Sequence, residues 1–158
     1  AYNFNGPSAI RYPRGSGPNV DVTEELAPIE IGEAKLIKEG NKNIVLLNFG
    51  ALLHEARIVA EDLDLTLIDM RFVKPLDTKI LKKYLRNAQM FISLEDGSIS
   101  GGAGSAVQEF CSEENIIIKS KLLGIPDKFV AHGSREDMIR DVGLEAKQII
   151  KTLETMLE

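Results

Sequence analysis

The stretch Ile44-Val45-Leu46-Leu47 decides the fold class of this chain. Four consecutive apolar residues are typical of a parallel strand that is covered on both faces. Gly50 ends this part of the chain, and residues 51–63 then carry apolar side chains at helical spacing. A second buried strand is expected over 65–69. A strand, a helix and a strand in this order predict a βαβ unit, in which the two strands are parallel.

The same alternation continues outward from this unit. The other predicted elements are strands over 34–38, 91–94 and 116–122 and helices over 78–85, 105–111 and 144–157. Asp77 and Ser134 each precede a helical segment and are expected to cap it, since short polar side chains accept backbone N–H groups there. The expected fold class is α/β, a three-layer α/β/α arrangement with a mostly parallel sheet of about five strands.

Proline, glycine and acidic residues mark a linker near the start of the chain. Before it, residues 8–12 have the pattern of a lone strand that belongs to another sheet. We therefore expect three parts: residues 1–15 as the last strand and loop of a preceding domain, 16–28 as the linker, and 29–158 as one domain. A chain that enters a strand directly after a Gly-Pro turn is expected to begin within a larger protein.

Composition and net charge narrow the kinds of partner and cellular location that are expected for this protein. The chain has 158 residues, of which 44% are hydrophobic and 27% charged, and its net charge is −5. This charge offers no basic surface, so nucleic acids and anionic membranes are not expected as partners. Cys111 is the single cysteine and cannot form an internal disulfide, which fits a reducing compartment. No apolar run approaches the roughly 20 residues that span a bilayer. We expect a cytoplasmic protein.

Arg14 is the sharpest candidate for a binding residue. It lies just past the predicted strand end, between Pro13 and Gly15. A guanidinium held on such a turn suits a bidentate contact with a phosphate or a carboxylate. A surface ion pair with an acid such as Glu24 is the alternative, and the residues alone leave both interpretations open.

A glycine cluster, Gly101-Gly102-Ala103-Gly104, follows a predicted strand and opens a helix. Backbone N–H groups at such a place can bind an anion. The cluster matches neither the dinucleotide fingerprint nor the phosphate loop, because Val107 takes the third glycine position and no Gly-Lys-Ser/Thr follows. Close packing of a neighbouring element or subunit against residues without side chains is the interpretation that we favour.

Other residues with useful chemistry are few. Glu95 and Asp96 end a strand, where open α/β sheets place ligand contacts, but they equally fit ordinary loop carboxylates. Neither His54 nor His132 has metal-ligand spacing with Cys111, so no zinc site is expected. Cys111 is expected to be a small core residue rather than a nucleophile. From the residues alone we assign no catalytic, cofactor-binding or metal-binding residue.

Five stretches, weak singly but specific when taken in order, carry a resemblance to a known family. They are Gly6–Gly15, Asp69–Asp77, Gly101–Val107, Leu123–Asp127 and Val142–Leu144. The chain resembles the C-terminal portion of the 1-deoxy-D-xylulose-5-phosphate synthases, a family of transketolase-like thiamine-diphosphate transferases. The Arg-Phe-Val-Lys-Pro-Leu-Asp part is shared loosely with transketolases and with the β subunits of 2-oxoacid dehydrogenases.

The resemblance implies an activity for a longer protein. The family condenses pyruvate with glyceraldehyde 3-phosphate, with loss of CO₂, for isoprenoid, thiamine and pyridoxal biosynthesis. Its members are homodimers that hold thiamine diphosphate and magnesium in two earlier domains, whose Gly-Asp-Gly…Asn motif does not occur in this sequence. Residues 1–15 would then end the pyrimidine-binding domain, and residues 29–158 would form the transketolase C-terminal-like domain.

The resemblance gives this chain a limited part in that activity. Arg14 matches the family's arginine that contacts the phosphate of glyceraldehyde 3-phosphate. The rest of the chain would mainly support the dimer, and the isolated chain is expected to be inactive. Two alternatives stay open. One is the tail of a 2-oxoacid dehydrogenase β subunit, which needs a lipoyl-bearing partner and which the Tyr12–Gly15 stretch disfavours. The other is a free-standing anion-binding or interaction module.

Overall fold

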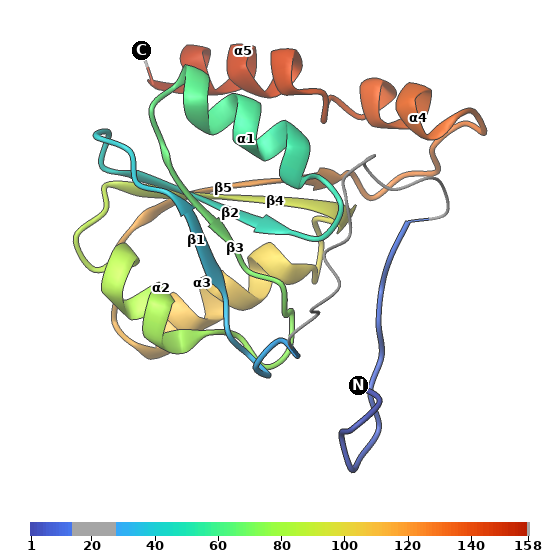
Figure 1. Cartoon of the computed structure of the whole chain (residues 1–158). Coiled ribbons are helices and arrows are strands. Elements are labelled where there is room, and N and C mark those ends of the chain that lie inside the picture. Colours follow the sequence, from blue (N-terminus) through green and yellow to red (C-terminus); the bar gives the residue numbers. More distant parts are fainter. Residues whose placement is uncertain (14–27, 158) are drawn as a thin grey trace.

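A five-stranded sheet lies between two layers of helices (Figure 1). The computed structural model describes residues 1–13 and 28–157. The strands, in spatial order, are β1 (Lys35–Lys38), β3 (Thr66–Asp69), β2 (Ile44–Phe49), β4 (Met90–Ser98) and β5 (Lys119–Ile125). β1 is an antiparallel edge strand and the other pairings are parallel. The predicted fold class is confirmed.

Helices cover both faces of the sheet (Figure 1). They are α1 (Leu53–Asp62), α2 (Thr78–Leu85), α3 (Ala103–Glu113), α4 (Arg135–Asp141) and α5 (Ala146–Leu157). α1 and α5 pack on one face, and α2 and α3 on the other. All six residues of β2 are buried. Because side chains alternate along a strand, Leu46 packs in the layer of α1 and α5, while Val45 and Leu47 pack in the layer of α2 and α3.

The predicted caps are confirmed. The Oδ1 atom of Asp77 accepts the N–H groups of Lys79 and Ile80, at 3.1 and 3.0 Å. Its Oδ2 atom accepts the N–H of Ala34 at 3.0 Å, so the same side chain also ties the start of α2 to the residue before β1. At the start of α4 the Ser134 hydroxyl accepts the N–H of Asp137 at 3.1 Å.

Three predicted strands differ from the structure. The strand expected over 91–94 runs from Met90 to Ser98 and so includes Glu95 and Asp96. β5 begins at Lys119 rather than at residue 116, because Asn115 takes a left-handed conformation and the N–H of Ile116 donates to Cys111, which closes the end of α3. Residues 8–12 form no strand. A strand needs a neighbouring strand for its backbone groups, and the described part of the chain supplies none to this segment. The assignment of residues 1–15 to a preceding domain stays a prediction.

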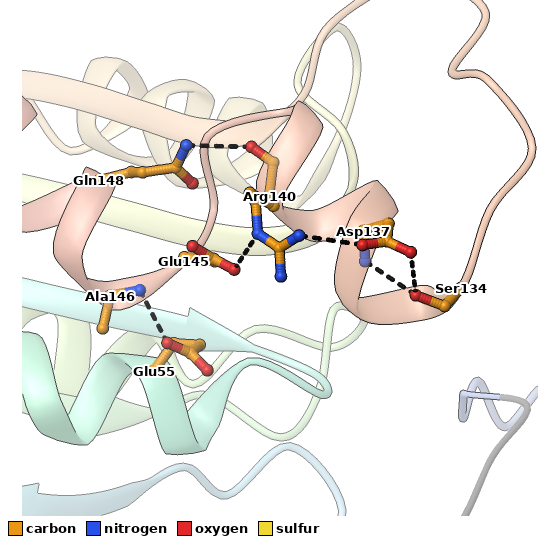
Figure 2. Close-up of polar contacts among 7 residues, drawn as sticks. All are labelled: Glu55, Ser134, Asp137, Arg140, Glu145, Ala146 and Gln148. Atoms are coloured by element: carbon orange, nitrogen blue, oxygen red, sulfur yellow. Dashed lines mark hydrogen bonds and ion pairs between the residues drawn. The ribbon is translucent and has the colours of Figure 1, made fainter.

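A polar network joins α4 to α5 (Figure 2). Arg140 donates to Asp137 at 3.0 Å and to Glu145 at 2.9 Å. The hydrogen bond from Ser134, assisted by the nearby Arg140 guanidinium, lowers the pKa of the Asp137 carboxyl. The carboxylate of Glu55, on α1, accepts the N–H of Ala146 at 2.7 Å and so holds the first residue of α5.

Acid should weaken this network through Asp137. A carboxyl whose pKa is lower in the folded chain than in the unfolded chain adds stability above the unfolded pKa, and that stability is lost as the pH falls through the folded value. Asp137→Asn should therefore lower the free energy of unfolding at neutral pH, with the difference from wild type closing below about pH 4. Urea unfolding at neutral and acidic pH measures this difference.

The matched control is Glu136→Gln, which removes an acid from the same first turn of α4, where the described residues give Glu136 no side-chain hydrogen bond. Its effect should be smaller, since only the attraction to the helix dipole is lost. A stability difference for Asp137→Asn that stays constant from neutral pH to acid would contradict the prediction.

Candidate functional site

The candidate site lies at the edge of the sheet where the parallel strands end. In open α/β sheets this edge is the usual place for ligand contacts. β2 and β4 run side by side to this edge, with Phe49 paired to Glu95. The two carboxylates that the sequence places here, Glu95 and Asp96, are therefore next to the end of β2.

Glu95 points inward and holds the start of α3. Its side chain is buried, and its two carboxylate oxygens accept the N–H groups of Ala103 and Gly104, each at 3.0 Å. The first N–H groups of a helix have no partner within the helix, and Gly102, the N-cap residue, has no side chain to offer. The carboxylate of Glu95 supplies that partner and lies at the positive end of the helix dipole.

The glycine cluster is shaped by this contact. A Cβ atom on Gly102 would meet the carbonyl oxygen of Ser98 and, at 2.5 and 2.7 Å, both carboxylate oxygens of Glu95. A Cβ on Gly104 would meet the Ser93 hydroxyl on β4 and Leu122 on β5. The packing interpretation of the cluster is confirmed. The backbone N–H groups that could have bound an external anion are already bonded to a carboxylate of the chain itself.

Asp96 binds the N-terminal segment rather than α3. The Nη1 atom of Arg11 lies 2.5 Å from its Oδ1 atom, and Nη2 donates to its backbone oxygen at 2.6 Å. The Asp96 side chain is only 14% exposed. Gly50, at φ +87°, leaves room for the pair, since a Cβ there would lie 3.0 Å from the Asp96 carboxylate and 3.3 Å from Arg11. Figure 1 shows the N-terminal segment beyond the ends of β2 and β4.

The other candidate residues of the sequence analysis lie away from this end of the sheet or outside the residues that the structure describes. Arg14 and Glu24 lie outside the described residues. Cys111, on α3, is buried in the core between the sheet and the layer of α2 and α3, as predicted. Burial raises the pKa of its thiol. His54 and His132 are exposed. In residues 1–13 and 28–157, no group of three or more His, Cys, Asp or Glu side chains could hold a metal ion.

Sequence reasoning named both carboxylates but found neither partner. The bond from Glu95 to α3 does have a signal: a carboxylate lies eight residues before a helix that starts without a polar cap. The bond from Arg11 to Asp96 has none, because 85 residues separate the two.

Within residues 1–13 and 28–157, no helix is long and apolar enough to cross a bilayer.

Comparison with known proteins gives consistent matches. Residues 32–149 match the family model of the transketolase C-terminal domain. The chain is 43% identical over 157 residues to 1-deoxy-D-xylulose-5-phosphate synthase of Pseudomonas paraeruginosa, which covers 99% of this chain and 25% of that protein. It is 45% identical over 148 residues to the synthase of Stutzerimonas stutzeri, covering 94% of this chain and 23% of that protein. The chain thus spans about a quarter of the length of these curated relatives.

Solved structures agree with the fold. A split-gene transketolase, described as an inactive tetramer of four beta chains, superposes with a TM-score of 0.73 at 26% identity. The match covers 82% of this chain and 43% of that one. The transketolase of Campylobacter jejuni superposes with a TM-score of 0.59 at 18% identity, covering 85% of this chain and 20% of that one. The second likeness concerns the fold alone.

Glu95 and Gly102 should act as two sides of one contact. Glu95→Gln leaves one N–H of α3 facing an amide group, and Gly102→Ala forces a methyl group against the carboxylate and against the backbone carbonyl oxygen of Ser98. Each should lower the free energy of unfolding by about 1–3 kcal/mol. The double variant should lose less than the sum, since either change alone already breaks the contact. Chemical unfolding of the four proteins measures this.

Gly101→Ala is the control for backbone strain. Gly101 has φ +69°, but a Cβ there would meet nothing within 4 Å. The loss in the free energy of unfolding caused by Gly101→Ala should come from backbone strain alone. It should add to the loss caused by Glu95→Gln. If Gly102→Ala were equally additive with Glu95→Gln, the shared contact would be refuted.

Proposed function

The chain belongs to the transketolase C-terminal domain family, and on this premise we propose that it forms the C-terminal part of a 1-deoxy-D-xylulose-5-phosphate synthase. The observation that carries the proposal is the identity of 43% with a curated synthase along 99% of the chain. The parent enzyme would condense pyruvate with glyceraldehyde 3-phosphate, with loss of CO₂, in the cytoplasm. Its product would enter isoprenoid, thiamine and pyridoxal biosynthesis.

The cofactor sites of the parent would lie in its other domains. When bound, thiamine diphosphate supplies the carbanion and the electron sink for the condensation. The described residues do not fit such a site, because the N–H groups at the start of α3 are bonded to Glu95 and no cluster of ligands could hold magnesium. We therefore derive no chemical step from this chain.

Arg14 would be the contribution of this chain to substrate binding. It stands in the stretch Tyr12-Pro13-Arg14-Gly15, whose match to the synthases supports a contact with the phosphate of the acceptor substrate. A guanidinium presents a planar fork of donors that fits a phosphate dianion. Such a contact, remote from the reacting carbons, adds binding energy and orients the aldehyde.

The remainder of the chain would support assembly as a homodimer. The split-gene transketolase that it resembles is described as a tetramer of β chains, so a chain with this domain can associate with copies of itself. The curated relatives favour a synthase over a 2-oxoacid dehydrogenase β subunit, and also over a free-standing anion-binding module.

The isolated chain should neither bind thiamine diphosphate nor consume pyruvate, because its sequence lacks the Gly-Asp-Gly…Asn motif that binds the diphosphate in the family. Titration calorimetry with the cofactor and magnesium tests binding, with the complete enzyme as the positive control. Binding of the cofactor by the isolated chain at micromolar concentration would overturn the domain assignment.

In the complete enzyme, Arg14→Ala should impair use of glyceraldehyde 3-phosphate and leave the KM for pyruvate unchanged, since pyruvate has no phosphate. A charge-assisted contact is worth roughly 1.5–3 kcal/mol, so kcat/KM for the acceptor should fall about ten- to a hundredfold. Arg14→Lys should recover part of it, because the charge remains but the fork is lost. Steady-state kinetics, with each substrate varied in turn, measure this. An unchanged KM for the acceptor would rule out the role.

A further inference from the structure

We propose that the carboxyl edge of the sheet, the edge at which β2, β3, β4 and β5 end, is the surface on which the preceding domain of the complete enzyme docks, with Phe129 as its largest apolar contact. The inference rests on the part of the proposed function that places further domains before this chain, which spans about a quarter of its curated relatives. It adds to that function the surface that joins the domains.

Exposed apolar side chains gather at the carboxyl edge. Val73 follows β3, Phe129 follows β5, and both are exposed. β1 runs antiparallel to β3, so the residues just before β1 emerge at the same edge. Ile29 and Ile31 are among these residues and are more than half exposed, at 57% and 56%. Three separate segments thus place large apolar side chains at one edge.

The opposite edge of the sheet differs in this respect. Of the described residues in its loops, 39–43, 63–65, 86–89 and 114–118, only Ile117 is a large apolar residue with an exposed side chain. Its exposure of 102% equals that of Phe129, at 106%. One exposed apolar side chain needs no explanation, but a group of them at one edge indicates an interaction surface.

The dimensions of this surface suit a single docked domain. Neighbouring strands lie about 4.8 Å apart, and β3 and β5 are three strand spacings apart in the sheet, so their loops emerge roughly 14 Å apart. An open groove of about 660 Å³, lined mostly by residues 30–34 and 75–80, lies next to Val73. A partner of standard size covers about 800 Å² on each side, which is enough to include both loops.

The N-terminal segment indicates what covers the surface. Arg11 binds Asp96 on β4, between the strands that lead to Val73 and Phe129. Figure 1 shows this segment on the same side of the sheet as the connection from β5 to α4. Residues coming from the N-terminal side of the chain therefore already reach the carboxyl edge.

The exposed side chains of this segment fit a strand of the preceding domain. Residues 8–12 are predicted to be the last strand of that domain, and in a strand Ile10 and Tyr12 point to the side opposite Arg11. Ile10 is 71% exposed and Tyr12 is 81% exposed, as expected of side chains whose own sheet lies outside the described residues. Such a strand would present Arg11 to this domain and its apolar side chains to its own sheet.

Covalent linkage favours this occupant over a second copy of the chain. A domain that is joined to the N-terminal segment has an effective concentration of up to about millimolar, so a modest surface is enough to dock it. Interfaces between domains of one chain are accordingly small and partly polar. The mixture of exposed apolar side chains with the pair of Arg11 and Asp96 fits such an interface.

Photocrosslinking of the complete enzyme tests the proposal. Phe129 is replaced by its photoreactive analogue benzoylphenylalanine, and mass spectrometry locates the residues that the analogue captures on irradiation. These residues should lie upstream of this chain, and the product should keep the mass of one subunit on a denaturing gel. The matched control carries the same analogue at Ile117, which is equally exposed in this domain but lies at the opposite edge. The control should capture none of the upstream residues.

Thiol labelling is a second measurement that does not need the bulky analogue. In the complete enzyme, Phe129→Cys should react with a maleimide at least about tenfold more slowly than Ile117→Cys, because the core of an interface packs as densely as a protein interior. Mass spectrometry of the peptides assigns the label to each position. Equal rates at the two positions would overturn the proposal.

The outcomes also separate this inference from the proposed function. A crosslinked product of twice the subunit mass would mean that a second copy covers the edge, and it would overturn the proposal. If the enzyme condenses pyruvate with glyceraldehyde 3-phosphate but Phe129 captures no upstream residue, the docking surface fails and the function stands. If the capture occurs as expected in a protein without this activity, the surface stands and the proposed function fails.

Discussion

The end of the sheet where the parallel strands terminate depends on one interaction, the burial of the Glu95 carboxylate against the start of α3. Removing a charge from water is costly unless hydrogen bonds and opposite charge compensate for it. Here two backbone N–H groups and the positive end of the helix dipole provide that compensation. The contact leaves no room for a side chain at Gly102, whose Cβ would also meet the carbonyl oxygen of Ser98. Gly104 is constrained separately, because a Cβ there would meet Ser93 on β4 and Leu122 on β5.

The same interaction separates the roles of two adjacent carboxylates. Successive residues of a strand point to opposite faces, and Glu95 continues the face of Phe91 and Ser93, toward α3. Asp96 binds Arg11 instead of α3, in the part of β4 where the pairing with β5 is irregular. One carboxylate binds the helix to the sheet and the other binds the N-terminal segment to the sheet. What the sequence presents as a pair of acids is thus two structural contacts with different partners.

How far the sequence predicts this arrangement depends on the distance between interacting residues. The buried run of β2 and the caps Asp77 and Ser134 follow from local patterns, and the structure has them where the patterns indicate. Local patterns gave wrong strands where a preceding residue or an adjacent strand decides whether a segment can form one. Residues 116–118 are apolar but follow the left-handed Asn115. Residues 8–12 have no adjacent strand among residues 1–13 and 28–157. The contact between Arg11 and Asp96 joins residues 85 positions apart, and no spacing rule reaches that far.

On the proposed function, these contacts concern how the C-terminal part of an enzyme could support substrate binding. Binding energy from a remote part of a substrate, such as a phosphate, can be used to orient the reacting end. An arginine provides that energy efficiently only if it is already in place, because ordering a loose segment would consume part of it. In the structure, α3 holds Glu95 in the second half of β4, and the neighbouring Asp96 holds Arg11. The packing of α3 on the sheet thus fixes the strand to which Arg11 binds the N-terminal segment.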